Sequence, residues 1–149
     1  MSSPYDKALK LLKIRPHHSE ELTKKLLMRG FSREQIQETI QKLQEENLLD
    51  NRQFAQMYLD ELLRTKTFGF YGLKAKLMQR GIPGHEAEDL LKENLSAEEE
   101  TNIAQKLINR ERDYDKIKFA QKLQRKGFRS DVIRKVLEKK QADNRKLLA

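Results

Sequence analysis

The sequence predicts an all-α fold made of three tandem three-helix repeats in an elongated, curved right-handed array. The main observation is a helical segment that ends in glycine three times, with glycine-to-glycine spacings of 51 and 46 residues. A leucine stands four residues before each glycine and a large apolar residue follows it, which is the pattern of a Schellman cap. The next helix is then apolar six and ten residues after the glycine, and no segment alternates with the period of a strand. The repeated pairs of leucine and glycine are Leu26 and Gly30, Leu77 and Gly81, and Leu123 and Gly127.

The period of about 45–50 residues falls in the range of stacked repeat architectures. It divides the 149 residues into three predicted domains, 1–49, 50–95 and 96–149, of which the last is the most basic. Hydrophobic residues make up only 37% and charged residues 36% of the chain, which is typical of small helical units with thin cores between them.

The predicted helices follow one another with recognisable start signals. Pro4 suits the first position of a helix that runs to about Ile14. The pairs Ser32 with Gln35 and Ser96 with Glu99 have the spacing of a capping box. The last helix is expected to start near residue 129 and to fray past residue 140. The predicted caps are, in chain order, Ser3, Ser19, Ser32, Asp50, Ser96 and Asp113.

Apolar residues at helical spacing identify the faces that should be buried. Two connectors interrupt this pattern, at 47–50 and at Ile82–Gly84, and the aromatic segment Thr65–Gly72 is the least repetitive part of the chain. The predicted inward positions are Ala8, Leu11, Leu12, Ile36, Ile40, Leu43, Phe54, Met57, Tyr58, Leu59, Leu62, Ile103, Ala104, Leu107, Ile108, Val132, Ile133, Val136 and Leu137.

The positive charge is concentrated in the last third of the chain. Of a net charge of +8, residues 100–149 hold 15 basic and 7 acidic side chains, whereas the other two thirds are balanced. This asymmetry indicates an anionic partner, either nucleic acid or an acidic protein surface; the alternative is an ordinary solvated helix face. Lys118, Lys122 and Arg125 form one face at i, i+4 and i+7. The other basic residues of this predicted surface are Lys126, Arg129, Arg134, Lys135, Lys139 and Lys140.

Two further patterns have open interpretations. The residues five and one before each glycine are always basic: Lys25 and Arg29, Lys76 and Arg80, Lys122 and Lys126. They could contact a partner, or they could only offset the helix dipole. The aromatic residues Phe68, Phe70 and Tyr71 lie among lysines, so they could stack on nucleic-acid bases, but packing between repeats is the favoured interpretation.

The chain lacks the residues that several kinds of chemistry require. The chain has no cysteine, and its three histidines, His17, His18 and His85, have no metal-binding spacing. We therefore expect no metal or cofactor. The adjacent pair is interpreted as turn or cap residues. There is no phosphate-binding glycine loop and no nucleophile next to a base, so we expect no enzyme activity. No apolar run has the length of a membrane span, and we expect a cytoplasmic monomer.

Three stretches resemble the RecX family, bacterial regulators of the recombinase RecA that are built from three-helix repeats. They are Arg15–Phe31, Leu43–Tyr58 and Phe68–Ile82, and the most specific is Leu-Leu-Asp-x-x-x-Phe-Ala-x-x-Tyr at Leu48–Tyr58. In the family's second repeat, Gly69 is followed by proline and basic residues, whereas here Phe70 and Gly72 stand in two of those places.

The resemblance implies that the protein lies in the groove of the RecA–DNA filament and inhibits its growth, ATP hydrolysis, strand exchange and co-protease activity. The residues expected to make contact are Lys76, Arg80, Lys118, Lys122, Arg125, Lys126 and Arg129. Weak, salt-sensitive binding to single- or double-stranded DNA would accompany this. Two other interpretations stay open: a stand-alone DNA-binding protein of tandem units that resemble helix-turn-helix modules, and a structural helical scaffold.

Overall fold

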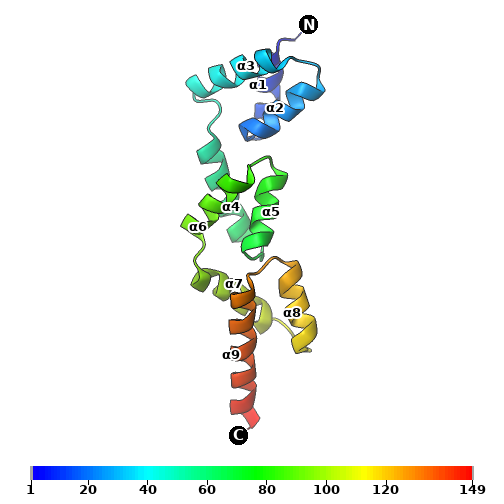
Figure 1. The fold of residues 1–149 in the computed structure, drawn as a ribbon, viewed down its shortest axis with the longest axis vertical. Coiled ribbons are helices and arrows are strands. Elements are labelled where there is room, and N and C mark those ends of the chain that lie inside the picture. The colour runs from blue at the N-terminus through cyan, green and yellow to red at the C-terminus, as the bar shows by residue number, and fades with distance from the viewer. Residues whose placement is uncertain (1, 149) are drawn as a thin grey trace. The chain divides into compact units, whose positions relative to one another are not determined.

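The computed structural model describes residues 2–148, and within this part of the chain there are nine α-helices and no strand (Figure 1). The all-α prediction is therefore confirmed. The helices are α1 (Pro4–Ile14), α2 (Ser19–Met28), α3 (Arg33–Glu45), α4 (Asn51–Thr65), α5 (Phe70–Gln79), α6 (Gly84–Asn94), α7 (Ala97–Asn109), α8 (Lys116–Arg125) and α9 (Ser130–Leu148).

Most predicted helix starts are confirmed by their hydrogen bonds. Ser3 caps α1, whose first turn begins with proline, and the capping boxes at Ser32 and Ser96 are both complete. Before α4, the Oδ1 atom of Asp50 accepts a hydrogen bond from the Gln53 N–H at 3.1 Å. These side chains satisfy N–H groups that have no partner within the helix.

Two predicted caps are wrong by one and two residues. The cap of α2 is His18, whose Nδ1 atom accepts from the Glu20 N–H at 3.0 Å. Ser19 is the first residue of the helix, and its hydroxyl instead accepts from the Asn51 side chain at 2.7 Å. The cap of α8 is Asp115 rather than Asp113. Helix α9 also continues to residue 148, past the expected loss of order at residue 140.

The three glycine turns are Schellman caps, as predicted. Gly30, Gly81 and Gly127 have φ angles of +90°, +91° and +81°, a region that penalises residues with a Cβ atom. In each turn, the N–H after the glycine donates to the carbonyl of the leucine four residues before the glycine. These N···O distances are 3.4, 3.2 and 3.1 Å in chain order.

The chain divides into two compact units, residues 1–59 with 77–87 and residues 60–76 with 88–149. In the first unit, α1, α2 and α3 (blue to cyan in Figure 1) enclose a core. In the second, α7, α8 and α9 enclose another, and the last part of α9 extends past its neighbours (Figure 1). The unit boundaries fall inside α4, α5 and α6. The division into three repeat domains stays a prediction.

The predicted inward residues are largely those of the observed cores. The first core is built from Ala8, Leu22, Leu26, Ile36, Leu43 and Leu49. The second is built from Ala104, Leu107, Ile108, Phe119, Leu123, Phe128, Val132, Val136 and Leu137. Met57 is an exception, because 57% of its surface is exposed although it was predicted to face inward.

The glycine turns also make close backbone contacts. In both units, the contacted residue has the same position relative to the glycine that ends its own helix. In the first unit, a Cβ atom added to Gly81 would lie 2.8 Å from the Glu21 Cβ. In the second, a Cβ atom on Gly127 would lie 2.0 Å from the Gly72 nitrogen. Glu21 and Gly72 each stand nine residues before the glycine of their own helix. The Gly30 turn has nothing within 4 Å of such an atom.

In the second unit, this contact includes hydrogen bonds from the start of α5 to the end of α8. The Gly69 N–H donates to the Lys126 carbonyl at 3.0 Å, and the Tyr71 N–H donates to the Gly127 carbonyl at 2.8 Å. A Cβ atom on Gly72 would lie 2.2 Å from the Lys126 carbonyl oxygen. Gly72 therefore has a steric role in this chain.

Candidate functional site

The predicted basic face on α8 forms as expected, but acidic residues lie beside it. Lys118, Lys122 and Arg125 line one shallow hollow together with Glu111 and two aspartates of the preceding loop. The Lys122 ammonium pairs with the Glu111 carboxylate at 2.7 Å. Lys118 and Arg125 are exposed. Two of the three predicted cations are therefore exposed to solvent, while the third is partly neutralised.

Arg129 is held inside the second unit instead of extending the α8 face. Its Nε atom donates to Oε1 of Glu100 at 2.5 Å, and its guanidinium lies 4.6 Å from the centre of the Phe70 ring. Glu100 is completely buried. Its Oε2 atom also accepts from the backbone N–H groups of Phe70 at 2.9 Å and Arg129 at 3.0 Å.

This buried carboxylate joins three helices. Phe70 is the first residue of α5 and Arg129 precedes α9, so Glu100 of α7 accepts from the starts of two other helices. Unpaired N–H groups and the positive end of the dipole are found at such starts, which makes a carboxylate stabilising there. Glu100 is not among the residues predicted for the site, although it lies four residues before the buried Ala104 on the apolar face of α7.

Three of the basic residues that precede the turn glycines contact aromatic rings. The Lys76 ammonium lies 5.4 Å from the centre of the Phe68 ring, and the Lys126 ammonium lies 5.5 Å from the same ring. The Arg80 guanidinium lies 5.2 Å from the Phe54 ring and 4.6 Å from the Tyr58 ring. These are cation–π distances. Lys76, Arg80 and Lys126 therefore have a packing role here, and partner contacts by these three residues stay a prediction.

The three aromatic residues near the start of α5 differ in exposure, so neither of the two interpretations given for them describes all three. Phe70 is buried at 4% exposure, which agrees with packing. Phe68 is half-buried next to its two lysines. Tyr71 is 56% exposed. The three rings consequently do not form one open stacking surface.

In the first unit, the adjacent histidines are both buried and hold opposite tautomers. Because the His18 Nδ1 accepts from a backbone N–H, its Nε2–H donates to Glu86, 3.0 Å away. The His17 Nδ1–H donates to the Arg15 carbonyl at 2.8 Å, and its Nε2 accepts from the Lys25 ammonium at 2.8 Å. Burial lowers the pKa of His17, and the neighbouring positive charge of Lys25 lowers it further.

Beside the histidines, two arginines approach one carboxylate. Arg15 binds Glu21 through both terminal nitrogens, at 3.0 and 2.7 Å, and the Arg80 Nε lies 4.0 Å from the same carboxylate. Burial by itself would raise the pKa of Glu21, but the hydrogen bonds and charge of Arg15 outweigh it and hold the pKa below its ordinary value. With His18 as the cap of α2, this region is a structural network.

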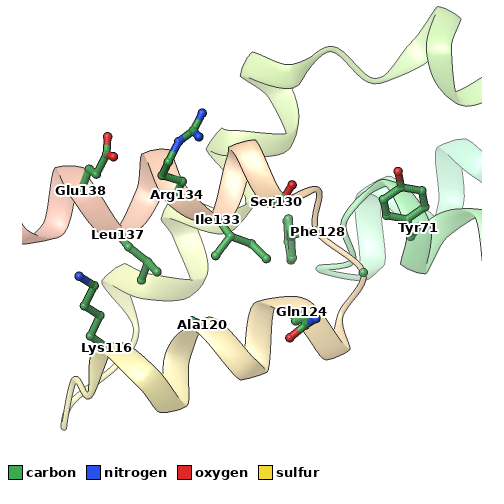
Figure 2. Close-up of a pocket in the computed structure, with 11 residues that line it drawn as sticks. Tyr71, Lys116, Ala120, Gln124, Phe128, Ser130, Ile133, Arg134, Leu137 and Glu138 are labelled. Atoms are coloured by element: carbon green, nitrogen blue, oxygen red, sulfur yellow. The ribbon is translucent and has the colours of Figure 1, made fainter.

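Of the remaining predicted cations, Arg134, Lys135 and Lys139 are exposed on α9 and Lys140 is half-buried there. Arg134 forms a surface ion pair with Asp131 at 3.3 Å and also lines a groove of about 670 Å³ between α8 and α9 (Figure 2). The exposed members of the predicted basic surface are thus distributed over α8 and α9, and among them Arg134 lines the groove.

Residues 2–148 contain no group of three or more histidine, aspartate or glutamate side chains arranged to hold a metal ion. In the same residues, no helix combines the length and the apolar character that crossing a bilayer requires.

Known proteins with similar sequences and folds carry one name. The sequence profile described as the first three-helix domain of RecX matches residues 5–43. The regulatory protein RecX of Prosthecochloris aestuarii is 34% identical over 136 residues, which cover 89% of this chain and 90% of that protein. Its namesake from Chlorobaculum tepidum is 31% identical over 144 residues, covering 92% and 88%. The crystal structure of RecX from Lactobacillus salivarius has a similar fold, with a TM-score of 0.79 and 24% identity, covering 91% of this chain and 93% of that one.

Proposed function

Because the chain belongs to the RecX family of regulatory proteins, we propose that it binds the RecA–DNA filament and inhibits its ATP hydrolysis, strand exchange and co-protease activity. We propose that it does so by lying in the filament groove. The observation that supports this most is the set of exposed cations on α8 and α9, Lys118, Arg125, Arg134 and Lys135, in a part of the chain with 15 basic and 7 acidic residues. Such a surface favours an anionic polymer or an acidic protein lobe, and a nucleoprotein filament offers both.

The direct test is a titration of this protein into RecA–DNA filaments while ATP hydrolysis is measured. We expect the hydrolysis rate to fall at protein ratios well below one per RecA subunit. An unchanged rate at saturating concentrations, in the presence of a filament confirmed by microscopy, would refute the proposal.

Stand-alone DNA binding is a second candidate function, which the exposed Lys118 and Arg125 support. The two candidates differ in the preferred target, since a filament regulator binds the filament more tightly than bare duplex. Neutralising Lys118 and Arg125 with glutamine should lower the slope of log K against log salt for duplex by about 1.8, at roughly 0.9 per phosphate contact. Because Lys122 is already paired with Glu111, adding Lys122→Gln should change the slope less than either of the other two.

The control for charge alone is a variant of basic residues on the first unit. Lys10→Gln with Lys24→Gln removes the same charge outside the second unit, and it should leave both affinities unchanged. A loss of binding equal to that of Lys118→Gln with Arg125→Gln would show that net charge, rather than this surface, determines binding.

A further inference from the structure

The groove between α8 and α9 has an apolar floor and a charged rim. In Figure 2, Ile133 and Leu137 point from α9 toward α8, where Ala120 leaves space. Lys116 stands on the α8 side, and Arg134 and Glu138 stand on α9. Phe128 completes the floor at the turn, and the exposed Tyr71 lies at that end. A volume of about 670 Å³ is within the range of pockets that bind ligands or partner side chains.

In the second repeat, an ion pair connects α5 and α6 at the positions that correspond to the α8–α9 groove. Lys74 on α5 stands seven residues before the turn glycine, and Glu88 on α6 stands seven residues after it. Their charged groups meet at 3.1 Å, and this contact lowers the pKa of the Glu88 carboxyl. In the third repeat, the same two positions are Ala120 and Arg134. A methyl group cannot reach the guanidinium, so the third repeat has an open groove where the second has a salt bridge.

The chemistry of the groove selects among possible occupants. An apolar floor gains from contact with apolar side chains, which a phosphate backbone lacks. The rim carries two cations, Lys116 and Arg134, and one carboxylate, Glu138. The surrounding part of the chain, residues 100–149, has 15 basic and 7 acidic residues, so its electrostatic potential favours a partner segment with carboxylates. The exposed apolar residues 147–148 of a second copy fit less well, because they follow Arg145 and Lys146 and would add positive charge to this surface. An acidic segment with apolar anchors meets both requirements.

We propose that the α8–α9 groove binds an acidic amphipathic helix of a partner protein. Its apolar side chains pack on Ala120, Ile133 and Leu137, and its carboxylates pair with Lys116 and Arg134. This is the arrangement in which a helix with apolar residues at i, i+3 and i+4 occupies a groove between two others. The proposal rests on the proposed function, in which the partner is the protein part of the RecA–DNA filament rather than its DNA.

Two substitutions at one position obstruct the groove in different ways. Ala120→Leu narrows it at its middle without a change of charge, and leucine is a good helix former. Ala120→Glu places a carboxylate where it can pair with Arg134, as Lys74 pairs with Glu88 in the second repeat. The neighbouring Gln121 is exposed on α8 and does not line the groove, so Gln121→Leu and Gln121→Glu are matched controls.

The experiment measures, for each variant, the protein concentration that halves filament ATP hydrolysis and the affinity for bare duplex. Both Ala120 variants should require about tenfold more protein for half-inhibition, whereas both Gln121 variants should match the unmodified protein. Ala120→Leu should bind bare duplex as the unmodified protein does. Melting temperatures confirm that each variant is folded.

The outcomes separate the groove from the proposed function. If the unmodified protein inhibits the filament and both folded Ala120 variants inhibit equally well, the groove proposal is wrong while the proposed function stands. If Ala120→Leu weakens duplex and filament binding to the same extent, the groove binds nucleic acid and the proposal is also wrong. If the unmodified protein does not inhibit, the proposed function fails and the proposal falls with it.

Discussion

Replacing Glu100 with glutamine should destabilise the second unit, because three donors share this one carboxylate. Glu100 accepts from the N–H groups that start α5 and precede α9 and from the Arg129 side chain, at 2.5–3.0 Å, with no exposure to water. Glutamine keeps the shape of the side chain but has one accepting oxygen, so its NH₂ group faces either Arg129 or the two N–H groups.

The expected cost follows from the bonds that are lost. A hydrogen bond to a charged group contributes about 1.5–3 kcal/mol, and glutamine loses at least one such bond. For a chain of this size, a melting temperature shifts by about 2–4 °C per kcal/mol, so Glu100→Gln should lower it by about 3–12 °C. Glu100→Ala leaves the Arg129 guanidinium unpaired and should cost about 3–5 kcal/mol.

The assay is thermal and urea unfolding of the variant beside Glu98→Gln, which removes the same charge at an exposed position two residues earlier. Hydrogen exchange of the Phe70 and Arg129 amides should accelerate in Glu100→Gln more than exchange elsewhere in the unit. If Glu100→Gln and Glu98→Gln unfold within about 0.5 kcal/mol of each other, the carboxylate does not stabilise these helix starts and the reasoning is refuted.

Two further predictions concern the glycine turns and pH. Gly30→Ala should cost only the positive-φ penalty of about 1–2 kcal/mol, whereas Gly127→Ala should cost about 1–3 kcal/mol more, because its Cβ atom would collide with Gly72 and break two backbone hydrogen bonds. Equal urea midpoints for the two variants would contradict this. Because the folded-state pKa of His17 is lowered, the unfolded chain binds more protons as the pH falls below about 6.5, and stability should decrease there. His17→Gln should remove this part of the loss between pH 7.5 and 5.5, and an unchanged slope would show that His17 titrates normally.

Local patterns were sufficient to predict much of the fold, because caps and helical periodicity depend on neighbouring residues. The Schellman turns at Gly30, Gly81 and Gly127 follow from a glycine, a leucine and an apolar residue within a few positions. The capping boxes are equally local. The missed caps at His18 and Asp115 also have a local reason, since neighbouring residues of suitable type compete and the path of the incoming chain selects one.

The candidate site was predictable only in part. Spacing alone placed Lys118, Lys122 and Arg125 on one face, because residues four apart on a helix are neighbours. The sequence could not assign Arg129 and Arg80 to contacts within the protein, since their partners Glu100 and Tyr58 are distant along the chain.

The sequence by itself determined the all-α class, the thrice-repeated helix with its glycine turn and the excess of positive charge in the last third. These depend on composition and on spacings of a few residues. Only the tertiary structure decided which charged side chains are paired within the protein and which face solvent. It buried Glu100 between three helices, and it left a groove open at Ala120, whereas an ion pair between Lys74 and Glu88 spans the corresponding positions of the second repeat. The physical reason is that burial and ion pairing depend on which distant segments meet, and spacing along one helix does not encode this.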